Sequence, residues 1–235
     1  RALGEYLSAT QVLASLLDGE FPAPSARRAR GRLRLAHDPV QKTLDQFDFD
    51  FQPSLDRKLI GELSTLRWVD ERRNVILLGP PGVGKTHLGI ALGVAATEAG
   101  YRTYFTSAAE MVANLQQAHL EGTAQFTLLT YTGPTVLVVD ELGYLPLDKS
   151  SANWIFQVVS RRYERSSPIV LTSNRGFSDW GQVFADQVVA SAIVDRLIHN
   201  AVVVNIRGRS YRMRAHQDPP SPPPAPVTNG PPPRR

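Results

Sequence analysis

Short apolar runs alternate with longer amphipathic stretches along most of the chain, from about residue 44 to residue 206. Short, mainly apolar runs suit strands that are buried on both faces of a sheet. Five runs predict such strands, at 75–78, 102–106, 136–139, 169–172 and 201–206. Apolar residues at helical spacing predict the helices between them, near 85–99, 108–120, 151–165 and 188–199. The alternation predicts an α/β fold, a parallel sheet covered by helices on both faces.

The two ends of the chain depart from this pattern. Apolar residues at helical spacing before Asp18-Gly19 predict a small helical N-terminal appendage. The last 17 residues hold nine of the 18 prolines and predict a disordered tail. We therefore expect three segments: a helical and basic segment at 1–40 that binds a partner or DNA, one α/β domain at 41–214, and a disordered Pro-rich tail at 215–235.

Composition narrows the class of protein. The chain has 235 residues, 42% hydrophobic and 20% charged, as in an ordinary soluble domain with one sizeable core. No apolar run approaches the roughly 20 residues that a membrane-spanning helix needs, and the start lacks the pattern of a secretory signal. The absence of cysteine excludes disulfides, thiol catalysis and Cys-ligated zinc. We expect a cytoplasmic protein that does not enter a membrane.

Charge is unevenly distributed along the chain. The net charge is +4, but residues 41–195 carry −4, while 1–40, 196–218 and 219–235 carry +2, +4 and +2. Basic ends around an acidic middle indicate a possible contact with nucleic acid.

Two arginine-rich groups are candidates for that contact. The denser group has five arginines within eight residues, Arg27, Arg28, Arg30, Arg32 and Arg34. On charge alone, a solvated helix face and a contact with the DNA phosphate backbone explain it equally well. The segment 207–214 is the second candidate, with packing against a neighbouring subunit as the competing interpretation.

The strongest chemical signal is a glycine-rich octapeptide between the first predicted strand and the first predicted helix. It has the pattern G-x-x-x-x-G-K-T and consists of Gly79, Pro80, Pro81, Gly82, Val83, Gly84, Lys85 and Thr86. Glycines let the loop curl so that backbone N–H groups point at a phosphate chain, and the helix dipole adds to the attraction. The lysine then reaches the β- and γ-phosphates, and the threonine hydroxyl binds Mg²⁺. The octapeptide predicts a site for ATP with Mg²⁺.

Two other predicted strands end in polar residues. Asp140 and Glu141 follow the run 136–139, where a carboxylate projects into the ligand crevice of an α/β sheet. We expect Asp140 to complete the Mg²⁺ shell and Glu141 to polarise a water for attack on the γ-phosphate, with an ordinary polar turn as the alternative. Asn174 follows the run 169–172 and could hold that water or sense the γ-phosphate, or only cap a turn.

Arg196 is a fourth candidate, on the last predicted helix. An arginine on a helix most often makes a surface ion pair. The functional alternative is an arginine donated across a subunit interface to the γ-phosphate of a neighbour, where the transition state gathers negative charge.

Several longer runs extend these motifs. They include Asp140-Glu141-Leu142-Gly143-Tyr144-Leu145-Pro146-Leu147-Asp148, Thr172-Ser173-Asn174, Phe177-Ser178-Asp179-Trp180-Gly181 and Asp195-Arg196-Leu197. Together with the octapeptide they resemble IstB-type transposition helper ATPases, within the AAA+ class that also holds DnaC-like helicase loaders and the initiator DnaA. The resemblance covers about residues 33–214.

The resemblance implies a P-loop NTPase fold with an AAA+ core, in which the strand before Asn174 lies between the strands of the octapeptide and of Asp140. It makes residues 79–86 the Walker A motif, Asp140 and Glu141 the Walker B motif, Asn174 sensor 1, and Arg196 the trans-acting arginine finger. Only 29 residues follow Ile206, so we expect no C-terminal lid and no arginine supplied by one.

The resemblance also implies an activity and partners. It implies an ATPase that assembles on double-stranded DNA as an ATP-bound homo-oligomer and assists a transposase in insertion-sequence transposition. A DnaC-like replicative helicase loader that uses ATP as a switch is the alternative.

Overall fold

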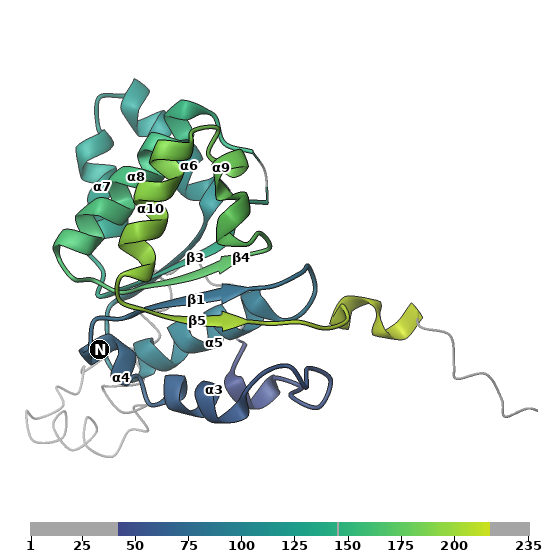
Figure 1. The fold of residues 1–235 in the computed structure, drawn as a ribbon. Coiled ribbons are helices and arrows are strands. Elements are labelled where there is room, and N and C mark those ends of the chain that lie inside the picture. The colour runs from purple at the N-terminus through teal and green to yellow at the C-terminus, as the bar shows by residue number, and fades with distance from the viewer. Residues whose placement is uncertain (1–41, 145, 217–235) are drawn as a thin grey trace, which may run out of the picture.

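The computed structural model describes residues 42–144 and 146–216, and its centre is one five-stranded sheet (Figure 1). The strands are β1 (Asn74–Leu78), β2 (Thr103–Ser107), β3 (Val136–Leu142), β4 (Ile169–Ser173) and β5 (Ala201–Asn205). Their order is β2-β3-β4-β1-β5, and all neighbouring pairs are parallel. The predicted parallel sheet is confirmed, each strand begins within one residue of its predicted start, and β4 lies between β1 and β3 as the resemblance implies.

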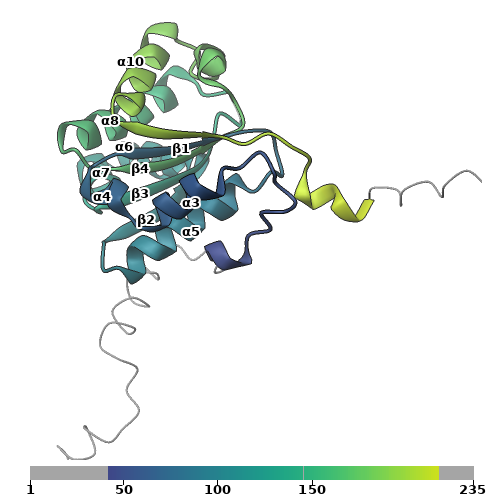
Figure 2. The ribbon, with the colours of Figure 1, turned by 60° about the horizontal axis from the view of Figure 1, so that its bottom comes forward.

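Helices cover both faces of the sheet (Figures 1 and 2). One face carries α3 (Arg57–Ser64), α4 (Arg67–Asp70) and α5 (Lys85–Glu98). The other face carries α6 (Ala108–Leu120), α7 (Ala124–Thr132), α8 (Lys149–Glu164), α9 (Trp180–Val183) and α10 (Gln187–Ile198). Short 3₁₀ turns complete the described chain: η1 (Leu44–Gln46), η2 (Phe177–Asp179) and η3 (Tyr211–His216).

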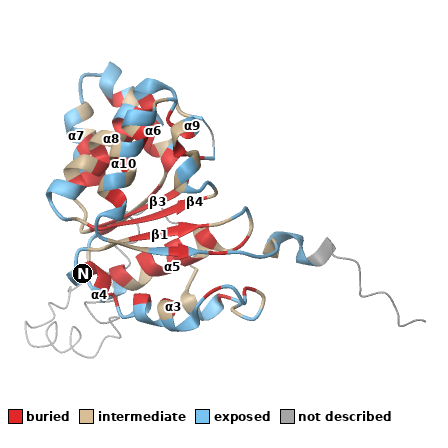
Figure 3. Ribbon diagram, in the orientation of Figure 1, coloured by how far each residue is buried: buried red, intermediate tan, exposed pale blue. Residues whose placement is uncertain are grey.

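Strand side chains alternate between two separate cores, one for each helical layer. Along β1, Ile76 and Leu78 pack into the core under α6–α10, whereas Val75 and Leu77 pack into the core under α3–α5. The central strands β1, β3 and β4 are therefore buried on both faces, as Figure 3 shows, whereas the edge strands β2 and β5 are only partly buried. This double burial explains why the central strands have continuous apolar runs rather than an alternating pattern.

The predicted helices are confirmed as α5, α6, α8 and α10, while α3, α4, α7 and α9 were not predicted. After β5 the described residues contain only η3 and no lid domain. The predicted helical appendage and the arginines at 27–34 lie outside the described residues and stay predictions. Of the tail predicted at 215–235, residues 215 and 216 belong to η3, and the rest lies outside the described residues.

Polar side chains close the end of the sheet where the strands begin. Arg162 on α8 has no solvent-exposed surface, and its guanidinium donates to four backbone carbonyls, those of Tyr131, Pro134, Thr135 and Pro168. Asn74 at the start of β1 donates to the Leu197 carbonyl and accepts the Ile169 N–H, both at 2.8 Å. These contacts fasten the first residues of β1 and β4 to the helices around them.

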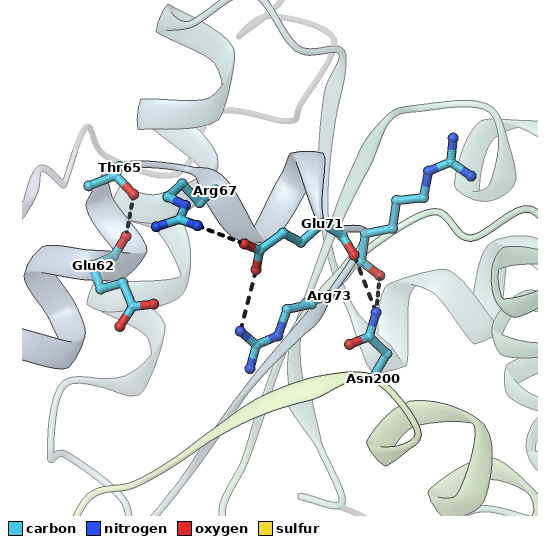
Figure 4. A network of polar contacts seen from close by, with 7 residues as sticks. Glu62, Thr65, Arg67, Glu71, Arg73 and Asn200 are labelled. Atoms are coloured by element: carbon cyan, nitrogen blue, oxygen red, sulfur yellow. Dashed lines mark hydrogen bonds and ion pairs between the residues drawn. The ribbon is translucent and has the colours of Figure 1, made fainter.

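A surface network continues this closure (Figure 4). Glu71 forms ion pairs with Arg67 and Arg73, at 3.3 and 3.5 Å. Asn200 donates to the carbonyl oxygens of Glu71 and Arg72, both at 3.3 Å. The turn before β1 is thereby tied to the turn before β5.

Candidate functional site

The octapeptide forms a tight loop between β1 and α5. Gly82 and Gly84 have φ values of 81° and 97°, a left-handed conformation that favours glycine. A Cβ atom on Gly84 would lie 2.5 Å from a ring carbon of Phe47, and one on Gly82 would lie 2.0 Å from the Ser210 hydroxyl. Glycine is thus required at both positions by backbone conformation and by close packing.

Lys85 is the first residue of α5 and only 9% exposed. Its ammonium donates to the loop's own carbonyls, Gly79 O at 2.7 Å and Pro80 O at 2.8 Å. Burial lowers the pKa of Lys85, and the charge of Arg212 also lowers it, while Asp140 and Glu141 oppose the shift. This positive site lacks a full negative counterpart, which a phosphate chain would supply.

Thr86 and Asp140 meet at the carboxyl ends of the strands, as the Mg²⁺ prediction requires. The Thr86 hydroxyl donates to Asp140 Oδ1 at 3.0 Å. The Thr172 hydroxyl donates to the same oxygen. A hydroxyl beside a carboxylate suits Mg²⁺, which commonly keeps several waters and binds substrate phosphates through few protein ligands. The donor set therefore fits the ion.

Glu141 and Asn174 lie on neighbouring strand ends beside this pair. The Glu141 side chain is exposed, and its backbone has a φ of 60°. Asn174 directly follows β4, and its Oδ1 atom is buried without a hydrogen-bond partner. An orphaned buried acceptor at this place suits a ligand or water that completes it. The sheet thus brings Lys85, Thr86, Asp140, Glu141 and Asn174 to one edge.

A cavity of about 470 Å³ opens beside the loop. Its walls come from the loop and from two distant segments, 42–52 and 211–212. Phe47 and His87 make an edge-to-face contact, and the His87 ring bonds the Thr43 carbonyl at 2.8 Å. Tyr211 donates its backbone N–H to Gly82 O at 2.9 Å, next to Arg212.

Sequence reasoning missed these two walls. The residues Lys42-Thr43-Leu44 and Phe47-Asp48-Phe49 were not assigned to any part of the site. Arg212 was considered only as part of a DNA or subunit surface, yet it lines the nucleotide cavity although no lid carries it.

Arg196 lies away from this edge. Its guanidinium donates to Ala192 O at 2.9 Å and stacks 5.0 Å from the centre of the Phe156 ring. It lines a separate cavity of about 530 Å³ with Asn74 and Ile169, at the amino ends of β1 and β4. Arg196 therefore lies at the opposite end of the sheet from the glycine-rich loop, and its role as an arginine finger stays a prediction. No helix among the described residues has the length and apolarity to cross a membrane.

The glycine-rich loop joins β1 to α5, β3 ends in the acidic pair, and β4 lies between β1 and β3. This arrangement defines a P-loop protein of the AAA+ class. The chain belongs to the family of IstB-like ATP binding proteins, whose model matches residues 1–218. The recognition made on the sequence is therefore confirmed, and ATP is the nucleotide that the family binds.

Known relatives agree with this assignment. A protein from Geobacillus stearothermophilus, named for insertion sequence IS5376 and ATP binding, is 44% identical over 91% of this chain and 86% of its own. One from Pseudomonas aeruginosa, named for insertion sequence IS21 and ATP binding, is 46% identical over 91% and 80%. The crystal structure of the DnaC helicase loader shares the fold, with a TM-score of 0.58 and 23% identity over 70% of this chain and 96% of that one.

Proposed function

We propose that this protein is a Mg²⁺-dependent ATPase that assembles on double-stranded DNA and assists a transposase. One observation supports the hydrolytic part of the proposal. The Thr86 hydroxyl donates to Asp140 Oδ1 at 3.0 Å, and the next residue, Glu141, has an exposed side chain. The Asp140 carboxylate thus lies at the proposed metal position, and the Glu141 carboxylate is available to contact the attacking water.

The proposed roles follow from these positions. The loop N–H groups of residues 79–86 bind the phosphates, and Lys85 leaves the carbonyls of its own loop to contact the β- and γ-phosphates. Thr86 and Asp140 hold Mg²⁺, which when bound neutralises charge on the phosphates. Glu141 accepts a proton from the attacking water, and Asn174 donates or accepts a hydrogen bond at that water or at the γ-phosphate. Arg196 reaches the γ-phosphate of a neighbouring subunit.

The cellular part of the proposal rests on the relatives. Two of them, at 44% and 46% identity, are named for insertion sequences. Insertion of such an element requires a transposase acting on double-stranded DNA, so an ATPase of the same element has DNA and that enzyme as its natural partners. The arginines Arg27, Arg28, Arg30, Arg32 and Arg34 are the proposed DNA contact.

Glu141→Gln tests the hydrolytic role. The amide keeps the size of the side chain but accepts no proton, so we expect phosphate release to fall by about 100-fold or more. Affinity for a fluorescent ATP analogue should stay within about threefold, because the phosphates are bound by the loop and Lys85.

Glu164→Gln is the matched control, since Glu164 is an exposed glutamate at the end of α8, far from the loop. It should hydrolyse ATP at the native rate. Normal phosphate release by the Glu141→Gln protein would show that Glu141 is not the base.

Assembly on DNA is tested by sedimentation with a duplex and a non-hydrolysable ATP analogue. We expect larger complexes with the analogue than with ADP, and an affinity that falls steeply with salt. Replacing Arg28, Arg30 and Arg32 by Ala should reduce the slope of log affinity against log salt by about two to three units. An unchanged slope would remove these arginines from the interface. Capture of a replicative helicase rather than the transposase would favour the helicase-loader alternative.

A further inference from the structure

Thr172 touches both acidic residues of the candidate site with one hydroxyl. It lies on β4, two positions before Asn174, and is 1% exposed. Its Oγ1 atom donates to Asp140 Oδ1 and accepts the backbone N–H of Glu141 at 3.0 Å. The contact joins the side chain of one residue to the main chain of the next.

The reason for this double contact is a bulge in β3. Val139 pairs with Leu171 and Leu142 pairs with Ser173, so two residues of β3 stand opposite the single residue Thr172. Such an extra residue interrupts the ladder and leaves main-chain groups without their usual partners. The Thr172 hydroxyl replaces the missing partner for the Glu141 N–H.

The bulge changes where the two acidic side chains point. In a regular strand, Asp140 and Glu141 would project to opposite faces of the sheet, and one of them would enter a hydrophobic core. Glu141 instead has a φ of 60° and an exposed side chain, while Asp140 is buried against Thr86. A left-handed backbone is unfavourable for a residue other than glycine and persists only where its surroundings fix it.

We propose that Thr172 is a positioning residue for both acidic groups. Its hydroxyl donates to Asp140 and so turns that carboxylate toward Thr86 and the metal position. The same hydroxyl accepts the Glu141 N–H and so holds the backbone that presents the Glu141 side chain. The inference deepens the proposed function and rests on it, because the metal and water positions are those of ATP hydrolysis.

Thr172→Val and Thr172→Ser separate the hydroxyl from the volume of the side chain. Valine has nearly the same shape but neither donates nor accepts, while serine keeps the hydroxyl. We expect Thr172→Val to lower kcat by about 30- to 100-fold, since misplacement of a reacting group by about 1 Å has an effect of that size. KM for ATP should change by less than about threefold, and Thr172→Ser should recover most of kcat.

Two readouts do not require turnover. The first is the gain in affinity for a fluorescent ATP analogue on adding Mg²⁺, which should be largely lost in Thr172→Val and kept in Thr172→Ser. The second is hydrogen exchange of the Glu141 amide, followed in peptides that span residues 140–142. Its exchange should be at least about tenfold faster in Thr172→Val, because the bond to Oγ1 is gone.

Thr132→Val is the control for the loss of a buried threonine hydroxyl. Thr132 is 2% exposed and donates to the Leu128 carbonyl at 2.9 Å within α7, shortly before the amino end of β3, whereas the loop follows the carboxyl end of β1. We expect a comparable loss of thermal stability from both valine variants, but native hydrolysis and a native Mg²⁺ effect from Thr132→Val.

The outcomes distinguish this inference from the proposed function. A Thr172→Val protein with a native Mg²⁺ effect and native Glu141 exchange overturns the role of Thr172, as does a serine variant no better than the valine variant. A native protein without any Mg²⁺ effect overturns it too. If the native protein binds Mg²⁺ and nucleotide but does not hydrolyse ATP, the proposed hydrolysis fails. The role of Thr172 then still stands on a Mg²⁺ effect and amide exchange that change only in the valine variant.

Discussion

The two ends of the parallel sheet hold buried cations in opposite circumstances. At the amino ends, the two terminal nitrogens of Arg162 donate to four backbone carbonyls that belong to fixed parts of the fold, and its Nε atom alone has no partner. At the carboxyl ends, Lys85 has only two carbonyls of its own loop. Each end also has an asparagine side chain. Both the nitrogen and the oxygen of the Asn74 amide form hydrogen bonds, whereas the Asn174 Oδ1 atom has no partner.

The difference separates groups that hold the fold from groups that await a ligand. A buried polar group whose partners are all supplied by the protein contributes to stability, and its removal leaves those partners unsatisfied. A buried polar group with too few partners has lost its hydrogen bonds to water, and the protein does not replace all of them. Such groups are common where a substrate completes the contacts. The first kind of residue should therefore affect stability when replaced, and the second kind should affect ligand binding or turnover.

The strongest test of the fold-holding end is Arg162→Met. Methionine fills part of the space but removes all four bonds, and of the four carbonyls only that of Pro168 keeps another donor, the Leu137 N–H, so we expect the free energy of unfolding to fall by about 3–5 kcal/mol. Urea denaturation measures this loss. Arg161→Met is the control, because Arg161 has one side-chain bond, to Gln125, and should change stability by less than about 1 kcal/mol. Equal losses from the two variants would contradict the comparison.

Lys85→Met is the corresponding test at the ligand end. Loss of the ammonium should weaken binding of an ATP analogue by about 100-fold, because a charge-assisted contact with phosphate is lost. Stability should fall by less than about 1 kcal/mol, since the buried ammonium has a desolvation cost that methionine lacks. Lys58→Met on α3, at an exposed position, should leave both properties unchanged. A Lys85→Met protein that unfolds as easily as Arg162→Met would break the distinction.

The two asparagines give the smallest and most direct comparison. Asn74→Ala should lower the free energy of unfolding by about 1–3 kcal/mol and leave turnover of the folded protein unchanged, because the Leu197 carbonyl and Ile169 N–H lose their partner. Asn174→Ala should lower kcat by about tenfold with stability changed by less than about 0.5 kcal/mol, since its orphaned oxygen makes no bond to lose. The comparison fails if both variants change the same property.

The fold could be predicted from the sequence where buried elements have continuous runs of apolar residues. The central strands β1, β3 and β4 were found because both of their faces meet helices, which forces apolar residues at successive positions. The edge strands β2 and β5 are only partly buried. α7 was missed because its segment, Ala124–Thr132, is uncharged and has no clear polar face, although Leu128 and Tyr131 are buried. Phe126 and Leu129 on the same helix are exposed, so apolarity and burial do not coincide there.

The site was predictable where its chemistry is contiguous. Residues 79–86 and the pair Asp140–Glu141 are local motifs, and their meeting follows from strand order. The contribution of Thr172 depends on a one-residue shift in the register of β3 and β4, which no local pattern encodes. The contribution of Arg212 depends on a chain that returns to Gly82 after β5, a contact between residues far apart in sequence.

The cavity wall formed by residues 211–212, which come late in the chain, has a consequence for the order in which the site forms during synthesis. Phe47 packs on the loop at Gly84, whereas Gln52 donates to the carbonyl of a residue made much later, Arg209, at 3.0 Å. β5 pairs with β1, and Tyr211 then contacts Gly82. A chain still emerging from the ribosome can form its early helices and the loop, but it cannot enclose a nucleotide until residues 201–212 have followed. The cavity beside the loop is therefore complete only once residues 201–212 have been synthesised.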